Sequence, residues 1–363
     1  MRKFLPLYIF VIFAGYLLYA ANTDGRESAY SDIADDEVIV FFRTAAWLDE
    51  DDNNWHVPIH GWIYEPEDST TRKALFAELV ESEFDLAPSA KTEANFSRRF
   101  NLLIADNERN KQIVIDIAGE KHSLPPSAEN GHFESTFVIS QAEVAEHIQN
   151  SHLGFSAVTG QGDTRKFVGD VVFVNPTGLS VISDIDDTVK ISNVTNKKEL
   201  LNHTFFLDFA AAPGMASLYD DWAERDASFH FVSSSPWQLY SPLQELLDAE
   251  GFPRSTLSLK AVRFRDDTLL DLFKKGTETK PAAIESVLAN YPGRQFVLVG
   301  DSGEQDPEVY AAILQKYPEQ ILRVYIRNVT QESASNERFT KVFENVDPDL
   351  WSLFDDPSTL VLP

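Results

Sequence analysis

The sequence predicts an α/β protein in two parts, a β-sandwich over residues 37–176 and a Rossmann-like domain with a parallel sheet over residues 177–330. In the first part, short runs of β-forming residues are separated by turn residues, as in a sandwich. In the second part, buried apolar strands alternate with helices, which is typical of a parallel sheet covered by helices on both faces. Proline and glycine in residues 175–180 separate the two patterns.

The first 21 residues have the pattern of an export signal. Arg2 and Lys3 precede an apolar run from Phe4 to Ala21, and polar and acidic residues follow it. The run is near the lower limit for a spanning helix, so a cleaved signal peptide and an uncleaved N-terminal membrane anchor both stay open. In either case the body of the protein is expected to be exported, to the periplasm or the outer face of the inner membrane. Residues 22–36 are polar and aperiodic, which predicts a linker.

The predicted sandwich contains two helical segments, over residues 72–84 and 140–150, because their apolar residues recur at spacings of three and four. Thr71 and Ser140 are the expected helix caps. The predicted strands of this domain are 37–43, 56–65, 111–117, 132–139, 153–159 and 166–174.

The second domain is predicted to place its functional residues at the carboxyl ends of its strands, as parallel sheets of this kind do. The predicted strands are 178–184, 228–234, 295–301 and 321–327, and the predicted helices are 213–225, 236–251, 280–293 and 307–318. The acidic tail, residues 331–363, is expected to pack back on the body through its aromatic side chains.

The composition excludes several kinds of site and partner. The formal net charge of −26 repels nucleic acid backbones at long range, so nucleic acid is not an expected partner. The chain has no cysteine, which excludes disulfides, thiolate catalysis and cysteine-ligated zinc.

Three carboxylates and a hydroxyl follow the first strand of the second domain directly, in the run Asp184-Ile185-Asp186-Asp187-Thr188. Such crowding of negative charge is costly without a cation, and Mg²⁺ prefers oxygen ligands of this kind. Alternate residues of an extended chain point the same way, so Asp184 and Asp186 are expected to face one site. Taken alone, the run is also compatible with an acidic turn that only caps the next element.

A cluster of hydroxyls ends the next strand, at Ser233, Ser234 and Ser235. Hydroxyls at a strand end are suited to donate hydrogen bonds to a phosphoryl oxygen. We interpret Ser235 as the cap of the helix that opens at Pro236, which leaves Ser233 as the phosphate ligand and Ser234 as a further substrate contact.

A lysine and an acidic loop complete the set of polar strand and helix ends. Lys280 begins a helix, where a cation opposes the helix dipole and gains nothing structurally, which favours a functional role. Asp301 follows a buried strand directly. Asp306 precedes Pro307 and is compatible with either a helix cap or a site residue.

Together these residues resemble the haloacid dehalogenase superfamily, whose motifs are DxDxT, a serine or threonine, a lysine and an acidic GDxxxxD loop. The resemblance covers residues 178–327. A narrower resemblance, to the App1-type phosphatidate phosphatase catalytic domain, is carried by SDIDDTVKISNV, APGMASLYDDWA, FHFVSSSPWQLY, GFPRSTLSLK and FVLVGDSGEQDPEVY. The segments IVFFRTAAW and HVPIHGWIYEP look like the region that precedes this domain in bacterial members.

The resemblance implies a Mg²⁺-dependent phosphatase that hydrolyses a phosphate monoester, phosphatidate, through an aspartyl-phosphate. It implies that Asp184 is the nucleophile and Asp186 the general acid and base, the latter also offering its carbonyl oxygen to the metal. The catalytic residues that it implies are Asp184, Asp186, Thr188, Ser233 and Lys280. The metal ligands that it implies are Asp184, Asp186, Asp301 and Asp306.

Two segments bear on the substrate. The flap, residues 189–212, carries apolar side chains that either admit an acyl chain or pack on a core of their own. Arg263 and Arg265 either bind a second acidic group of the substrate or pair with Asp266 and Asp267.

Three functions fit these expectations. The first is a phosphatase for a phosphorylated lipid at a membrane surface. The second is a periplasmic phosphatase for soluble phosphomonoesters, because the chain has an export signal and an acidic surface whereas the eukaryotic relatives act on internal membranes. The third is a non-catalytic binding module, against which the intact motif set speaks.

Overall fold

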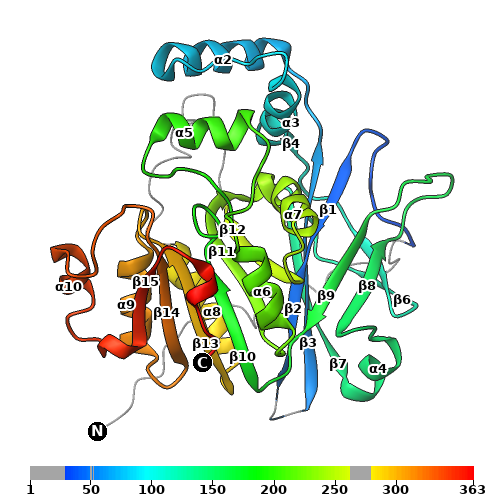
Figure 1. The fold of residues 1–363 in the computed structure, drawn as a ribbon. Coiled ribbons are helices and arrows are strands. Elements are labelled where there is room, and N and C mark those ends of the chain that lie inside the picture. Colours follow the sequence, from blue (N-terminus) through cyan, green and yellow to red (C-terminus); the bar gives the residue numbers. More distant parts are fainter. Residues whose placement is uncertain (1–28, 50, 52, 262–278) are drawn as a thin grey trace, which may run out of the picture.

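The computed structural model describes residues 29–49, 51, 53–261 and 279–363 (Figure 1). The predicted leader, residues 1–21, and the two candidate substrate ligands Arg263 and Arg265 lie outside the described residues, so these predictions stay untested. Within the described part of the chain, no helix combines the length and the apolar character that crossing a bilayer requires.

The N-terminal domain is built from nine strands, mostly antiparallel, in the order β1-β3-β2-β9-β8-β5-β6, with β4 and β7 also pairing with β3. The strands are β1 (Val38–Phe42), β2 (Thr44–Asp49), β3 (Asn54–Glu65), β4 (Asp106–Asn107), β5 (Val114–Ile117), β6 (Glu120–Ser123), β7 (His132–Ser140), β8 (His152–Ala157) and β9 (Val168–Phe173).

Strand β2 joins the two halves of this sheet. Its first residues, Thr44 to Ala46, pair with β9, and its last residues, Trp47 to Asp49, pair with β3. Apolar side chains of both halves, such as Ile59 of β3 and Val171 of β9, share one core. The predicted β-rich domain is therefore present, while its assignment as a sandwich of two sheets stays a prediction.

The C-terminal domain contains a six-stranded sheet in which every pair is parallel, in the order β12-β11-β10-β13-β14-β15. The strands are β10 (Gly178–Ser183), β11 (Ser228–Pro236), β12 (Ser255–Lys260), β13 (Arg294–Asp301), β14 (Ile321–Arg327) and β15 (Trp351–Phe354). Numbered along the chain, this order is 3-2-1-4-5-6, the doubly wound order. The predicted α/β fold with a parallel sheet is confirmed, and its ligand crevice is expected where β10 meets β13.

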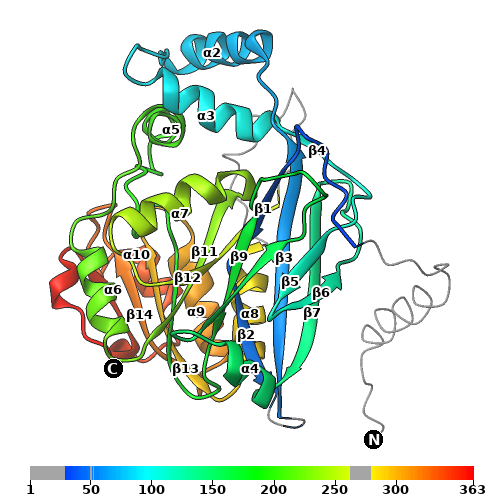
Figure 2. The same cartoon turned by 90° about the vertical axis from the view of Figure 1, so that its right-hand side faces the viewer.

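Helices cover both faces of this sheet (Figure 2). Neighbouring strand residues point to opposite faces: Val181 packs with α6 (Met215–Ala223) and α7 (Tyr240–Ala249), whereas Ile182 packs with α8 (Thr279–Asn290) and α9 (Asp306–Lys316). Strands buried on both faces explain why their sequences are continuously apolar instead of alternating.

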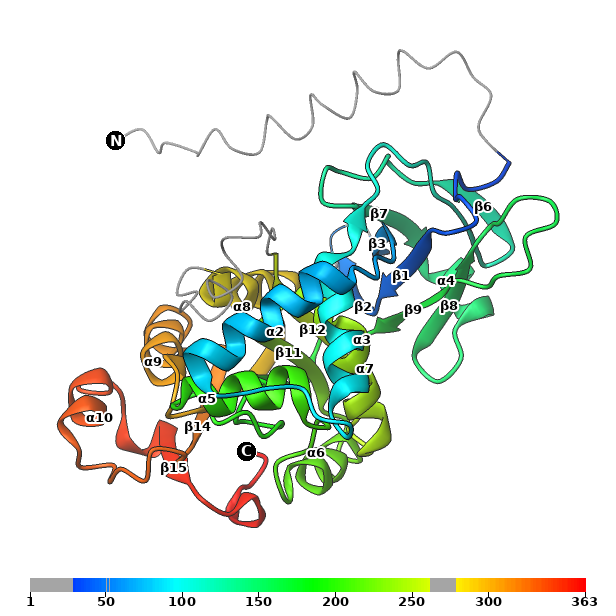
Figure 3. The same ribbon diagram turned by 90° about the horizontal axis from the view of Figure 1, so that it is seen from above.

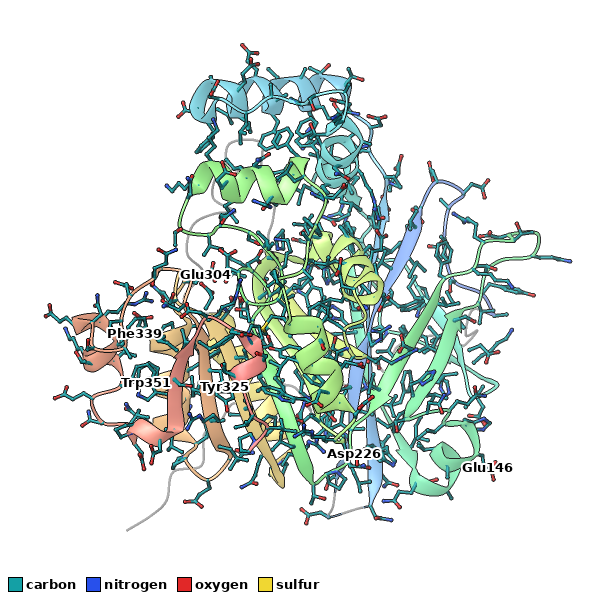
Figure 4. All side chains as sticks on the ribbon, viewed as in Figure 1. Glu146, Asp226, Glu304, Tyr325, Phe339 and Trp351 are labelled. Atoms are coloured by element: carbon teal, nitrogen blue, oxygen red, sulfur yellow. The ribbon has the colours of Figure 1, made fainter. Side chains whose placement is uncertain are left out.

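The C-terminal tail packs on the body through its aromatic side chains, as predicted, and it also extends the sheet of this domain beyond residue 330. It contributes α10 (Glu337–Val342) and the sixth strand, β15, which pairs with β14. Phe339 and Trp351 of the tail lie together beside the sheet (Figure 4), and Trp351 stacks on Phe343 at 4.0 Å between ring centroids. A four-residue edge strand carries too short a pattern to be recognised in the sequence.

A layer of helices lies over the carboxyl ends of the parallel strands (Figure 3). It combines α2 (Thr70–Phe84) and α3 (Glu93–Ile104) of the N-terminal domain with α5 (Lys197–Leu201) and the π-helical turn Asn202–Phe206 of the flap. They share one apolar cluster, which contains Phe76, Val80, Phe96, Phe100, Leu103, Ile104, Leu201, Phe205 and Phe206. Leu201, Phe205 and Phe206 of the flap therefore pack on helices of the other domain and not on a core of their own, whereas admission of an acyl chain stays a prediction.

The helix starts test the predicted caps. α2 is capped by Ser69, whose side chain accepts from the backbone N–H of Arg72, so the prediction of Thr71 was wrong by two residues. α4 (Gln141–His147) begins as predicted after Ser140, whose hydroxyl forms a capping box with Glu143.

The two domains share an apolar and hydrogen-bonded boundary. Phe42 of β1 lies against Trp237 and Tyr240, with ring centroids 4.4 Å and 4.8 Å apart. The backbone N–H of Arg43 donates to the Tyr240 hydroxyl at 2.8 Å. Trp237 follows the serine cluster Ser233–Ser235 after one residue, so the boundary lies next to the predicted site.

A buried histidine makes the stability of the C-terminal domain depend on pH. Burial, together with the charge of Arg294, lowers the pKa of His230 to about 3 from its ordinary value of 6.5. The unfolded chain therefore binds a proton that the folded chain excludes, and stability falls as the pH drops from 6.5 toward 3. We expect wild type to lose about 2 kcal/mol more between pH 7 and pH 5 than His230→Leu loses. Urea denaturation of both proteins at each pH measures this difference, and equal losses would contradict the prediction.

Candidate active site

The candidate site lies at the switch point of the parallel sheet, where β10 and β13 end side by side. Asp184 follows β10 and its backbone N–H donates to the carbonyl of Val299 in β13 at 2.9 Å. Asp301 is the last residue of β13. The sheet order therefore brings together two acids that lie more than 100 residues apart in the chain.

Asp187 shapes the loop that carries Asp184. Its backbone has a φ of 56°, in the left-handed region that tolerates aspartate. Its carboxylate accepts from the backbone N–H groups of Ser192, Asn193 and Val194 at 2.8, 2.8 and 2.6 Å. The third carboxylate of the motif is thus used to hold the loop.

Both carboxylate oxygens of Asp184 are held. The Thr188 hydroxyl donates to Oδ2 at 3.0 Å, and the Lys280 ammonium donates to Oδ1 at 2.8 Å. The side chain is buried. The structure thus brings the predicted nucleophile, hydroxyl and lysine together.

Lys280 lies in the middle of an acidic group. Its ammonium also contacts Asp306 and lies 3.7 Å from Glu304. Burial alone would lower the pKa of Lys280, but Asp184 and Asp306 outweigh it and raise the pKa well above its ordinary value. Lys280 is therefore a fixed positive charge in the site.

Three carboxylates form a buried cluster, with ligand oxygens of Asp184, Asp301 and Asp306 within 4.8 Å of one another. Burial, together with the neighbouring acids, raises the pKa of Asp184 and of Asp301 well above the ordinary value. Burial also raises the pKa of Glu304 to about 7. Figure 4 shows Glu304 at the upper edge of the sheet, beneath α5.

One oxygen of this cluster has room for a cation. Asp301 Oδ1 accepts from the backbone N–H groups of Gly303 and Glu304, at 2.6 and 3.1 Å. Asp301 Oδ2 is buried and has no hydrogen-bond partner among the described residues. A divalent hard cation fits this oxygen and these acids, because it replaces the missing partner and offsets the repulsion between the carboxylates.

Gly300 allows Asp306 to reach the cluster. A Cβ at position 300 would lie 2.3 Å from Asp306 Oδ2. From this position Asp306 Oδ2 accepts from the Asp301 backbone N–H at 3.1 Å. Asp306 is therefore a site residue and not the cap of α9, because it is the first residue of the helix and Gln305 occupies the cap position.

Asp186 faces a different set of groups from those around Asp184. Lys190 donates to its Oδ1 at 2.7 Å and Ser192 to the same oxygen at 2.6 Å. Ser235 and Ser233 donate to its Oδ2 at 2.8 and 3.2 Å. Its carboxylate is not part of the acidic cluster, so a metal contact of Asp186 through its carbonyl oxygen stays a prediction.

Burial on its own would raise the pKa of Asp186. The Lys190 ammonium and the hydrogen bonds from Ser192 and Ser235 outweigh burial and lower the pKa below its ordinary value. Asp184 and Asp186, two residues apart, thus have environments that shift their pKa values in opposite directions, a common feature of sites that use two carboxylates in different roles.

Sequence reasoning missed three of these partners. Lys190 and Ser192 follow the motif directly, and Lys190 is 2% exposed, which is unusual for a lysine without a role. Ser235 is not a helix cap as predicted, because β11 continues to Pro236 and the turn after it has no side-chain cap. The role of Ser234, which lies between the two Asp186 donors, stays a prediction.

Arg338 of the C-terminal tail stabilises the acidic loop, residues 300–306. Arg338 donates to the carbonyl oxygens of Ser302 and Glu304, the latter at 2.6 Å, and pairs with Glu308. These contacts fix the backbone on either side of Gly303, so the tail helps to position the cluster.

Comparison with known proteins identifies the domain that contains this site. Residues 179–328 match the family described as phosphatidate phosphatase APP1, catalytic domain. Phosphatidate phosphatase APP1 of Saccharomyces cerevisiae is 33% identical over 174 residues, which cover 47% of this chain and 29% of the relative. An uncharacterized protein of Schizosaccharomyces pombe is 28% identical over 207 residues, 55% of this chain and 34% of the relative. The chain thus spans about a third of the length of these relatives.

A solved structure, D,D-heptose 1.7-bisphosphate phosphatase from B. bronchiseptica complexed with magnesium and phosphate, is 12% identical with a TM-score of 0.29. The alignment covers 50% of this chain and 94% of that chain. A score this low supports no conclusion about this protein. The family match and the yeast relative show that residues 179–328, which contain the site, are similar to the App1-type phosphatidate phosphatase catalytic domain.

Proposed function

We propose that this protein is a Mg²⁺-dependent phosphatase that converts phosphatidate to diacylglycerol through an aspartyl-phosphate. The observation that carries the proposal is Asp184, buried between Lys280 and Thr188 at the edge of a three-carboxylate cluster, with Asp186 in a separate hydrogen-bonded setting. The family of the domain supports the substrate class.

In the first step, a carboxylate oxygen of Asp184 bonds to phosphorus while the bond from phosphorus to the ester oxygen breaks. Asp186 gives its proton to the departing alkoxide. The Lys190 charge lowers the pKa of Asp186, and the negative charge of a phosphoryl group beside Asp186 opposes this effect. The phosphoryl group therefore favours the protonated carboxyl that this step needs.

In the second step, Asp186 takes a proton from water, whose oxygen attacks phosphorus and releases Asp184 and inorganic phosphate. Lys280 and Ser233 orient the phosphoryl oxygens throughout both steps, since a fixed cation and a hydroxyl need no reorganisation as charge develops.

Asp184, Asp301 and Asp306 would hold Mg²⁺, which when bound offsets negative charge on the phosphoryl group. Thr188 keeps Asp184 in place beside this site. Arg338 and Gly300 hold the acidic loop in the geometry that lets Asp306 approach Asp301.

A second candidate is a periplasmic phosphatase for soluble monoesters. It is favoured by the net charge of −26, which repels anionic lipid head groups at long range. Export of the chain belongs to the same proposal, and mass spectrometry of the mature N-terminus checks it, since a fragment that begins near Ala21 or Asn22 implies cleavage.

The test is phosphate release by the purified full-length chain in detergent, with Mg²⁺ or with EDTA. Phosphatidate in mixed micelles is compared with glycerol phosphate, sugar phosphates and nucleotides. We expect Mg²⁺-dependent release with the highest kcat/KM for phosphatidate. A higher kcat/KM for a soluble ester would keep the mechanism and replace the substrate, and no release from any ester would contradict both candidates.

A further inference from the structure

A helix of the N-terminal domain holds the flap of the catalytic domain. Arg99 of α3 is 5% exposed, and its Nη1 donates to the carbonyl oxygens of Leu207, Thr204 and His203 at 2.6, 3.1 and 3.4 Å. Carbonyls at the end of a helical turn lack partners within the turn, so a buried guanidinium that supplies donors fixes the turn.

Asn95, one turn earlier on α3, adds to this contact. Its side-chain amide donates to the carbonyl of Phe206 at 3.1 Å and to the carboxylate of Asp208 at 2.8 Å. The apolar cluster of α2, α3 and the flap lies directly beside these bonds. The flap is therefore positioned by residues that are absent from the catalytic domain itself.

The flap transmits this position to the catalytic loop. Its two ends pair with each other through Ile191 N–H to Ala210 at 2.9 Å and Ala212 N–H to Val189 at 2.8 Å. The Phe209 ring centroid lies 3.8 Å from Arg99 Cζ and 4.9 Å from Lys190 Nζ. One aromatic ring thus contacts a cation from each domain.

Lys190 connects the Phe209 ring to Asp186, because its ammonium donates to the Asp186 carboxylate at 2.7 Å. A continuous set of contacts runs from Arg99 through Phe209 and Lys190 to Asp186. We propose that Arg99 is a positioning residue of the active site, which orients the acid and base Asp186 from the other domain. This inference rests on the proposed function, since it needs Asp186 to act on the leaving group.

The nature of the leaving group separates this role from a merely structural one. An alkoxide needs a proton as it leaves, whereas p-nitrophenolate leaves without one. Asp186 serves the second step with every ester, so the two esters are compared by the first step alone, followed in a single turnover with enzyme in excess. A shift of Asp186 should slow the release of diacylglycerol from phosphatidate in that turnover and leave the release of p-nitrophenolate almost unchanged. General loosening of the fold would slow both.

The test compares Arg99→Met with Arg98→Met in the full-length chain. Arg98 is the neighbouring residue on α3 and also pairs across the domain boundary, with Glu245, but both side chains are more than half exposed, and no hydrogen bond or ion pair joins Arg98 to the flap among the described residues. For Arg99→Met we expect the single-turnover rate of diacylglycerol release from phosphatidate to fall by about 10- to 100-fold. For the single-turnover release of p-nitrophenolate we expect a change below about threefold, and Arg98→Met should match wild type on both esters.

Phe209→Leu distinguishes a loss of positioning from a folding defect, because it removes the ring beside Lys190 and leaves the three hydrogen bonds of Arg99 intact. It should show the same selective loss, and Asp186→Asn should show it more strongly. Equal losses on both esters, or no loss, in Arg99→Met and Phe209→Leu would overturn the inference while the proposed function stands. Inactive wild type, or Asp186→Asn without selectivity, would instead overturn the proposed function and the inference with it.

Discussion

Asp184→Asn is expected to lower phosphate release by about 10⁴-fold or more, because the amide has no charged oxygen to attack phosphorus. The substitution keeps the shape of the side chain, and the Thr188 hydroxyl keeps an acceptor. Since burial makes the charged form of Asp184 costly, as its raised pKa shows, we expect the fold to tolerate the neutral amide. The free energy of unfolding should change by less than about 2 kcal/mol.

The matched control is Asp221→Asn. Asp221 lies on α6 with a half-exposed side chain and pairs only with Arg225 in the described structure. This variant should keep wild-type kcat and KM. If purified, folded Asp184→Asn retained more than a tenth of wild-type activity, Asp184 would not be the nucleophile.

Removal of Mg²⁺ is expected to abolish activity, and Asp301→Asn should raise the Mg²⁺ concentration needed for half-maximal rate by at least about 10-fold. Asp301 is buried, and its Oδ2 lacks a hydrogen-bond partner among the described residues. A neutral amide at this position is a weaker ligand for a hard cation and removes one of three clustered charges.

A thermal shift measures binding independently of turnover. Mg²⁺ at 100 times its Kd should stabilise wild type by about 2.7 kcal/mol, whereas Asp301→Asn should show little of this gain at the same concentration. The shift should also weaken as the pH falls, because Asp184 and Asp301, two of the acids that would bind Mg²⁺, have raised pKa values and protons compete with the ion. Asp221→Asn again serves as the control. If addition of Mg²⁺ changed neither the melting temperature nor the activity of the wild-type protein, the metal assignment would be contradicted.

The sequence by itself determined the parallel sheet and most of the candidate site. Continuous apolar strands, each followed by a polar residue, are a local signal, and their order along the chain places Asp184, Ser233 and Asp301 at one edge of a sheet. Lys280 was recognisable because a cation at a helix start has no structural benefit. Family resemblance added the chemistry, which spacing alone did not specify.

The sequence did not separate the surroundings of Asp184 from those of Asp186. Both belong to one acidic run, but Lys280, 96 residues away, contacts the first and Lys190, four residues away, contacts the second. Which groups lie beside which acid depends on the loop geometry that Asp187 fixes. Burial and neighbouring acids raise the pKa of Asp184 despite Lys280, whereas Lys190 and two serine hydroxyls outweigh burial and lower the pKa of Asp186.

Only the tertiary structure decided how the N-terminal domain meets the site. The α3 sequence has an apolar face. Its periodicity indicates that a helix buries this face, but it does not indicate which element the face packs against. Arg99 and Leu207 are 108 residues apart, and no pattern in either segment refers to the other. Long-range packing follows from the shape and register of whole elements, so the flap, its helical cover and the path to Asp186 became visible only in three dimensions.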